Sequence, residues 1–161
     1  MEGYRNENRC VKAVLEKIAD AQRKITIDPR EPSIQASIDE SAKNKKNTIP
    51  FILYCGSKPF IAHGVMPSAD YRRQKGSWLW FPTFLFRVKD IKGDCASLEL
   101  LKLKEHPAFK TMNTNVECTP CCQLDYAEID DLVPTGMHIT VDVSCFSSIQ
   151  CLPALYIVPA L

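Results

Sequence analysis

Residues 136–152, GMHITVDVSCFSSIQCL, decide the fold class because they combine a clear strand pattern with two closely spaced cysteines. Between Ile139 and Val143 an apolar residue occupies every second position, which is typical of a half-buried β-strand. Cys145 stands at the end of this predicted strand, and Cys151 follows just beyond the next turn. Thiols at the margin of a strand are within reach of another chain or of each other. The segment therefore favours covalent linkage over catalytic turnover.

Strand signals separated by turn signals recur from residue 49 onward. The predicted strands are Ile49–Cys55, Cys95–Leu103, Leu124–Ile129 and Met137–Val143. A helix is an alternative for the second of these, because Leu, Glu and Lys all favour helices. The aromatic run Ser77–Val88 contains Pro82, which cannot donate a ladder hydrogen bond, so we expect a bulge, an edge position or two strands. This pattern predicts a mainly β fold, an antiparallel β-sandwich that is jelly-roll-like.

One short amphipathic helix and one polar segment are predicted before the strands. Apolar residues recur at helical spacing from Val11 to Ile18, so we expect a helix from Asn8, its N-cap, to about Lys24. Residues 28–48 contain two prolines and many polar side chains, which indicates a linker or an irregular arm. The expected organisation is an N-terminal helix segment at 1–27, a polar arm at 28–48 and a β-sandwich domain with an apolar C-terminal tail at 49–161.

The composition excludes several classes of function. Twenty basic and nineteen acidic residues give a net charge of +1 without a basic half, which argues against nucleic-acid binding. The polar start MEGYRNENRC lacks the apolar run of a secretory signal, and no run approaches the ~20 apolar residues of a membrane span. We therefore expect a protein made in a cytosol without a signal peptide, with neither nucleic acid nor a membrane as its partner.

The eight cysteines are many for such a chain, since cytosolic thiols are normally kept reduced. A chain of this length buries about two-thirds of its unfolded surface and does not need disulfides to fold. A metal site, buried structural thiols, and disulfides formed after the compartment becomes oxidising all explain the composition. The cysteines are Cys10, Cys55, Cys95, Cys118, Cys121, Cys122, Cys145 and Cys151.

Two of these cysteines have the spacing of half a zinc site. Cys118 and Cys121 form a C-x-x-C pair, whose two-residue spacer lets two thiolates bind one tetrahedral ion. A structural zinc needs four ligands, and no second close pair at zinc-ribbon spacing is present. A thioredoxin-like redox motif is weaker still, because the strand–helix–strand setting is absent. The zinc-binding adaptor protein remains the alternative function, with Cys118 and Cys121 as ligands.

Catalytic chemistry has little support in the sequence. A nucleophilic cysteine needs a positioned histidine, and none of His63, His106 and His138 belongs to a catalytic motif. A thiol-dependent enzyme with Cys145 as its nucleophile therefore ranks third. The aromatic residues of 77–88 are expected to pack in the core or in a subunit interface, because no positive charge accompanies them. We expect a protein that is not an enzyme and needs no cofactor.

Four blocks of the chain resemble the CotY, CotZ and ExsY family of cysteine-rich coat and exosporium proteins of endospore-forming bacteria. They are Thr48–Phe60 (TIPFILYCGSKPF), Phe86–Leu103 (FRVKDIKGDCASLELLKL), the region Val116–Cys118, and Ile139–Leu152 (ITVDVSCFSSIQCL). The pair Cys10-Val11 before a short helix is similar too. The last block is the most specific.

The resemblance implies a structural protein of the spore surface, in the outer coat or the basal layer of the exosporium. Family members self-assemble into two-dimensional protective lattices, commonly of hexameric units, that disulfides cross-link. The resemblance also implies synthesis in the mother-cell cytoplasm, deposition on the spore surface, and contacts with other coat or exosporium proteins. Oxidation after synthesis then explains the cysteines of a protein without a signal peptide.

The cysteine pattern of the family is matched at five positions, but the region after the first helix lacks the additional cysteines of close relatives. Ser147 stands where family members usually carry a further cysteine, so we expect either a lower density of cross-links or a subgroup with a different role in the layer. Cys121 and Cys122 look like additions, and adjacent cysteines rarely bond to each other because of disulfide geometry. Cross-linking candidates also include Cys55. The cysteines that align with the family pattern are Cys10, Cys95, Cys118, Cys145 and Cys151.

Overall fold

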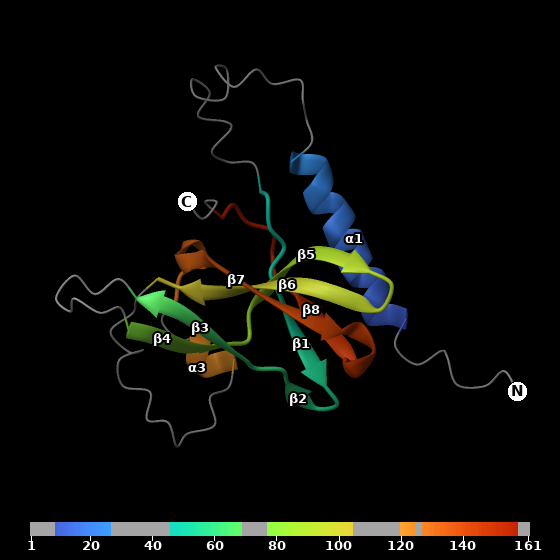
Figure 1. Ribbon diagram of the computed structural model, residues 1–161. Coiled ribbons are helices and arrows are strands. Elements are labelled where there is room, and N and C mark those ends of the chain that lie inside the picture. The colour runs from blue at the N-terminus through green and yellow to red at the C-terminus, as the bar shows by residue number, and fades with distance from the viewer. Residues whose placement is uncertain (1–8, 27–45, 69–76, 105–119, 125–126, 158–161) are drawn as a thin grey trace, which may run out of the picture.

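The computed structural model describes residues 9–26, 46–68, 77–104, 120–124 and 127–157 (Figure 1). The described elements, in chain order, are α1 (Arg9–Thr26), β1 (Phe51–Cys55), β2 (Lys58–Pro59), β3 (Ala62–Ser68), β4 (Ser77–Thr83), β5 (Phe86–Lys92), β6 (Cys95–Leu103), α3 (Pro120–Leu124), the 3-10 turn η3 (Ile129–Asp131), β7 (Leu132–Asp142), the 3-10 turn η4 (Val143–Cys145) and β8 (Ser148–Cys151).

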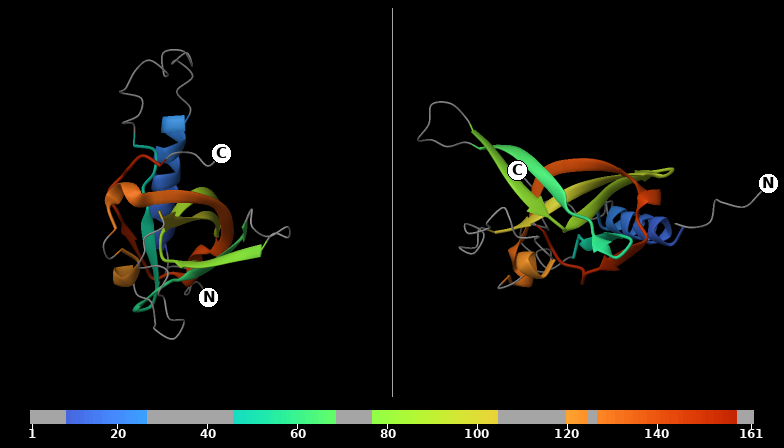
Figure 2. Two further views of the ribbon diagram at one scale, coloured as in Figure 1. Left: turned by 90° about the vertical axis from the view of Figure 1, so that its left-hand side faces the viewer. Right: turned by 90° about the horizontal axis from the view of Figure 1, so that it is seen from below.

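Six strands form one antiparallel sheet in the order β2-β1-β5-β6-β7, and β8 pairs with β1. The sheet curls, because β7 at one edge leads through η4 directly into β8 beside β1 (Figure 2). Two tight turns contain a glycine with positive φ, Gly56 between β1 and β2 and Gly93 between β5 and β6. Glycine suits both positions because it has no Cβ to clash in this conformation.

A separate two-stranded ribbon consists of β3 and β4, paired from Ala62 opposite Thr83 to Ser68 opposite Ser77. Its inner face packs against the sheet: Ala62 is buried, and Phe81 lies against the main core cluster. Gly64 suits this face, because a Cβ there would clash with the Phe81 ring. One face of the β3–β4 ribbon therefore packs against the core, and the other face does not.

The helix α1 belongs to the main hydrophobic core. Its inner face consists of Val11, Leu15, Ile18 and Ala19, which are almost completely buried with residues of β1, β5 and β6. Gln22 fixes the last turns of the helix, since its amide donates to the Val88 carbonyl at 2.8 Å and accepts from the Ile49 amide at 3.2 Å. In Figure 1 α1 runs along the sheet beside β5.

A second, smaller core lies where the C-terminal residues return to the sheet. Leu155 and Ile157 are buried there with residues of β6 and of the start of β7. The backbone of Leu155 exchanges hydrogen bonds of 3.0 and 2.8 Å with Thr48. The predicted apolar tail is thus packed, as far as residue 157, against its own chain.

The mainly β, antiparallel fold with one N-terminal helix is confirmed. The helix and the strand Cys95–Leu103 agree with the prediction, and Ser77–Val88 divides into β4 and β5. The finer description of a jelly-roll-like sandwich stays a prediction, as does the division at residues 27 and 48. Asn8, the expected N-cap, lies outside the described residues.

The strand predicted at Leu124–Ile129 is wrong, and β3 and β8 were not predicted. Residue 124 ends α3, and residue 129 begins η3. The side chain of Gln123 holds α3 in place by accepting from the Phe84 amide and donating to the Thr83 hydroxyl, both at 2.8 Å. The η3 turn is closed by the Glu128 amide, which donates to the Asp131 carboxylate at 2.9 Å. Local side-chain hydrogen bonds thus outweigh strand propensity here.

Candidate functional site

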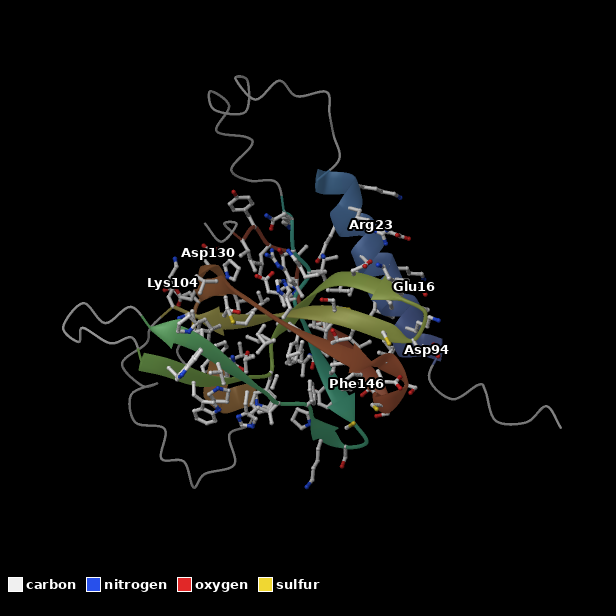
Figure 3. The ribbon with its side chains drawn as sticks, viewed as in Figure 1. Glu16, Arg23, Asp94, Lys104, Asp130 and Phe146 are labelled. Atoms are coloured by element: carbon white, nitrogen blue, oxygen red, sulfur yellow. The ribbon has the colours of Figure 1, made fainter. Side chains whose placement is uncertain are left out.

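Four cysteines lie at one end of the molecule, where three turns and the start of α1 meet. Cys10 belongs to the first turn of α1, Cys55 ends β1, Cys95 begins β6, and Cys145 ends η4. All four side chains are exposed and carry free thiols. Figure 3 labels Asp94 and Phe146 at this end of the molecule. We call these four residues the thiol end.

Two contacts hold the start of α1 and η4 beside the β5–β6 turn. Lys12 of α1 forms an ion pair of 3.3 Å with Asp94, the neighbour of Cys95. The Asp94 carbonyl accepts from the Val143 amide at 2.8 Å, and Cys95 stands opposite Asp142 in the register of β6 and β7. Three of the four thiols are therefore carried by segments that touch each other directly.

The fourth thiol, that of Cys55, contacts the backbone of Cys145. The Cys55 Sγ donates to the carbonyl oxygen of Cys145 over 2.8 Å, although the two residues are 90 positions apart in the chain. The contact arises because β8 pairs with β1, with Tyr54 opposite Ser148, and this pairing brings η4 to the end of β1. The sequence offers no local signal for this proximity, since it depends on long-range strand pairing.

Ser147 lies at the thiol end as well, next to the β1–β2 turn. Its hydroxyl donates to the carbonyl oxygens of Tyr54 and Gly56, each at 3.2 Å, and its amide donates to Tyr54 at 2.9 Å. The position where the resemblance implies a further cysteine thus lies beside Cys55. Here the serine joins the β1–β2 turn to the start of β8.

Two charged side chains, Asp142 and Lys12, lie close to the cysteines of the thiol end. The Ser144 hydroxyl and amide both donate to the Asp142 carboxylate, at 2.6 and 2.9 Å, and lower the pKa of Asp142 below its ordinary value. Asp142 thereby caps η4. The carboxylate keeps its negative charge near Cys145 at neutral pH, while Lys12 contributes a positive charge beside Cys95.

Cys151 stands apart from the thiol end. It lies opposite Phe51 at the other end of β1, so the length of that strand, about 13 Å, separates it from Cys55 and Cys145. This separation exceeds the Cα distance of about 7 Å that a disulfide can bridge. Cys151 therefore cannot bond to Cys55 or Cys145 of the same copy. Cys151 is exposed, yet partial burial raises the pKa of its thiol.

The C-x-x-C cluster is described only in part. Cys118 lies outside the described residues, while Cys121 and Cys122 belong to α3, which Gln123 anchors to the sheet. Among the described residues no three metal-binding side chains gather around one point. The zinc hypothesis for Cys118 and Cys121 therefore stays a prediction.

The exposure of the thiols indicates what this arrangement can do. Unpaired cysteines are among the most frequently buried residues in proteins, and buried cysteines are inert. Each of the five cysteines whose side chain the structure describes is exposed instead. Such thiols are accessible to oxidation and to the thiols of another chain.

Comparison with known proteins identifies the family of the chain. No described helix has the length and apolar character that crossing a bilayer requires. A search of solved structures found no match. Spore coat protein Z of Bacillus subtilis (strain 168) is 28% identical over 145 residues, which cover 89% of this chain and 88% of that protein. The family model described as spore coat protein Z matches residues 1–154. The chain therefore belongs to the spore coat protein Z family, as the resemblance predicted.

Proposed function

We propose that this protein is a non-enzymatic structural subunit of the spore surface, which self-assembles into a two-dimensional lattice and is then cross-linked by disulfides. Membership of a spore coat family supports the structural role in the coat. The observation that carries the finer proposal is the thiol end: four exposed thiols on three adjoining turns and a helix start.

The thiol end favours bonds between copies for a geometric reason. Cys10 and Cys95 point to solvent at the surface of one end, where a second molecule can approach them. A copy that presents the same end brings up to eight thiols into one contact, so several pairings are within reach. Cys151, on the exposed strand β8, provides a separate point of linkage. Links at two places on each copy extend an assembly rather than closing a dimer.

Assembly precedes oxidation in this proposal. Non-covalent contacts place the copies, and oxidised glutathione or another disulfide then exchanges with the thiols, taking up two electrons for each protein disulfide formed. A disulfide typically contributes ~2–4 kcal/mol within one chain. Between copies, its larger effect is to prevent dissociation. The result is a shell that persists after the non-covalent contacts are weakened.

The remaining parts of the proposal follow from the family resemblance. The chain is made in the mother-cell cytoplasm and is deposited on the forespore, in the outer coat or the basal layer of the exosporium. Hexameric units are the proposed repeating unit of the lattice. Other coat or exosporium proteins are the proposed neighbours of the layer.

The thiol end can be tested by replacing its four cysteines with serine in the full chain. After oxidation with oxidised glutathione, the wild-type protein should form a ladder of cross-linked species on non-reducing gels and a lattice in electron micrographs. The variant C10S/C55S/C95S/C145S should lose most of the ladder, while the single variant Cys151→Ser should still form cross-linked species through the thiol end, although of smaller size. A wild-type protein that stays monomeric on such gels and forms no lattice contradicts the proposed function.

A further inference from the structure

The outer face of the β3–β4 ribbon carries the most exposed apolar side chains of the described molecule. Trp78 is 75% exposed, Trp80 is 55% exposed and Val65 is 51% exposed. The register places Val65 opposite Trp80 and Pro67 opposite Trp78, so these side chains share one face. The His63 ring stacks on Trp80, with ring centroids 5.2 Å apart. We call these five residues the aromatic stripe.

From this stripe we infer a docking surface for a second copy of the same chain, and this inference rests on the proposed self-assembly. The stripe contains no Asp, Glu, Lys or Arg. When two such faces meet about a two-fold axis, no carboxylate, ammonium or guanidinium group of the stripe opposes its own copy or has to be desolvated. A face of this kind is complementary to itself. Recognition of a charged partner would instead require charged residues in the stripe.

The size of the stripe fits one weak contact of a lattice. At about 250 Å² for a whole tryptophan side chain, Trp78 and Trp80 together expose roughly 300 Å². Two stripes face to face therefore bury roughly 600 Å² from these residues alone, with Val65 and Pro67 adding to it. A stable isolated dimer needs about 1,000 Å² or more. The contact is thus sized for weak association, which a high protein concentration reveals without disulfides, and further contacts and disulfides strengthen the attachment in a repeated array.

The position of the stripe also favours an array over a closed pair. The end of β3 and the start of β4 lie away from the start of α1, η4 and the β5–β6 turn in both Figure 1 and Figure 2. One copy can therefore contact a neighbour through its stripe and other neighbours through its thiol end. Two different contacts at distant places on each molecule generate an extended assembly.

Tryptophan fluorescence reports directly on the aromatic stripe, because Trp78 and Trp80 are the two tryptophans of the chain. In a reducing buffer, where no disulfide contributes, the tryptophan emission of the full chain should shift to shorter wavelength as the protein concentration rises. Sedimentation should show association over the same concentration range. Trp78→Thr keeps a strand-forming residue at an exposed position and should weaken self-association at least tenfold, the effect of losing a hot-spot tryptophan.

Tyr156→Thr is the matched control, since Tyr156 is 41% exposed and lies outside the ribbon. It should associate as the wild type does. Emission that does not depend on concentration overturns the inference, as does association of Trp78→Thr that equals the wild type. A shift that appears only after another coat protein is added also overturns it, because the occupant is then not a second copy. If the stripe fails these tests while oxidised wild-type protein still forms a lattice, the proposed function stands without it.

Discussion

Replacing Arg87 by alanine is expected to lower the free energy of unfolding by about 3 kcal/mol, because it removes the main partner of a buried carboxylate. Glu99 on β6 is only 2% exposed, and the Arg87 guanidinium on β5 pairs with its Oε2. Arg87 also donates to the Thr48 hydroxyl at 3.1 Å. The pair thus joins the two central strands to the segment that holds the C-terminal residues.

Lys89→Ala is the matched control for this prediction. The Lys89 Nζ lies 3.7 Å from the same carboxylate oxygen, but its side chain is 44% exposed. Its loss should cost at most about 1 kcal/mol, as for other solvent-accessible ion pairs. Urea unfolding with an unchanged slope measures both values. A loss for Arg87→Ala no larger than that for Lys89→Ala would refute the role given to the buried pair.

The effect of Arg87 should also depend on pH. Burial raises the pKa of Glu99, but the hydrogen bond and charge of Arg87, the charge of Lys89 and the Gly136 amide together lower it below its ordinary value. A carboxyl group with a lowered pKa stabilises the fold fully above its unfolded pKa of about 4.3, and this contribution disappears as the pH falls through the folded pKa. The difference between wild type and Arg87→Ala should therefore shrink in acid.

Replacing Phe146 by alanine is expected to lower the free energy of unfolding by about 3–5 kcal/mol, the usual loss for a buried phenylalanine. Phe146 is 3% exposed, and its ring packs edge-on against Phe60 with centroids 5.2 Å apart. Phe60 in turn stacks on Phe86 at 5.6 Å. The three rings of Phe146, Phe60 and Phe86 thus connect η4, which carries Cys145, to the centre of the sheet.

The nearby Ser148→Ala serves as the control for Phe146→Ala. Ser148 is exposed at the start of β8, so its substitution should change the stability by no more than about 0.5 kcal/mol. Phe146→Ala should also loosen the position of Cys145, because the following residue no longer fills the core. If the free energy of unfolding of Phe146→Ala equals that of Ser148→Ala, the Phe146 ring does not fix the position of η4.

The sequence predicted the elements whose signals are local. The strand Cys95–Leu103 matches β6 because its leucines follow a turn in which Gly93 adopts positive φ. The helix agrees within two residues because the apolar spacing from Val11 to Ile18 matches the buried face. The strand β3 was not predicted, because its sequence AHGVMPS contains glycine and proline and becomes a strand only through its pairing with β4.

The candidate site could be predicted only as a set of residue types. The sequence identified Cys10, Cys55, Cys95 and Cys145 as linkage candidates but could not place them together, because their proximity depends on the return of β8 to β1. The aromatic run was predicted to pack in the core or an interface. In the structure this run divides: Phe86 is buried in the core, whereas Trp78 remains exposed. Which residues face outward depends on the register of the ribbon, which no local pattern determines.

Disulfide mapping between differently labelled copies tests the central claim most directly. Full-length chains labelled with ¹⁵N are mixed with unlabelled chains under reducing conditions, allowed to assemble, oxidised with oxidised glutathione and digested for mass spectrometry. We predict disulfide-linked peptide pairs that contain one labelled and one unlabelled partner, with Cys10 or Cys95 among the linked residues. Disulfides that join only peptides of the same label, or thiols at this end that stay unlinked in the assembled material, would contradict the account.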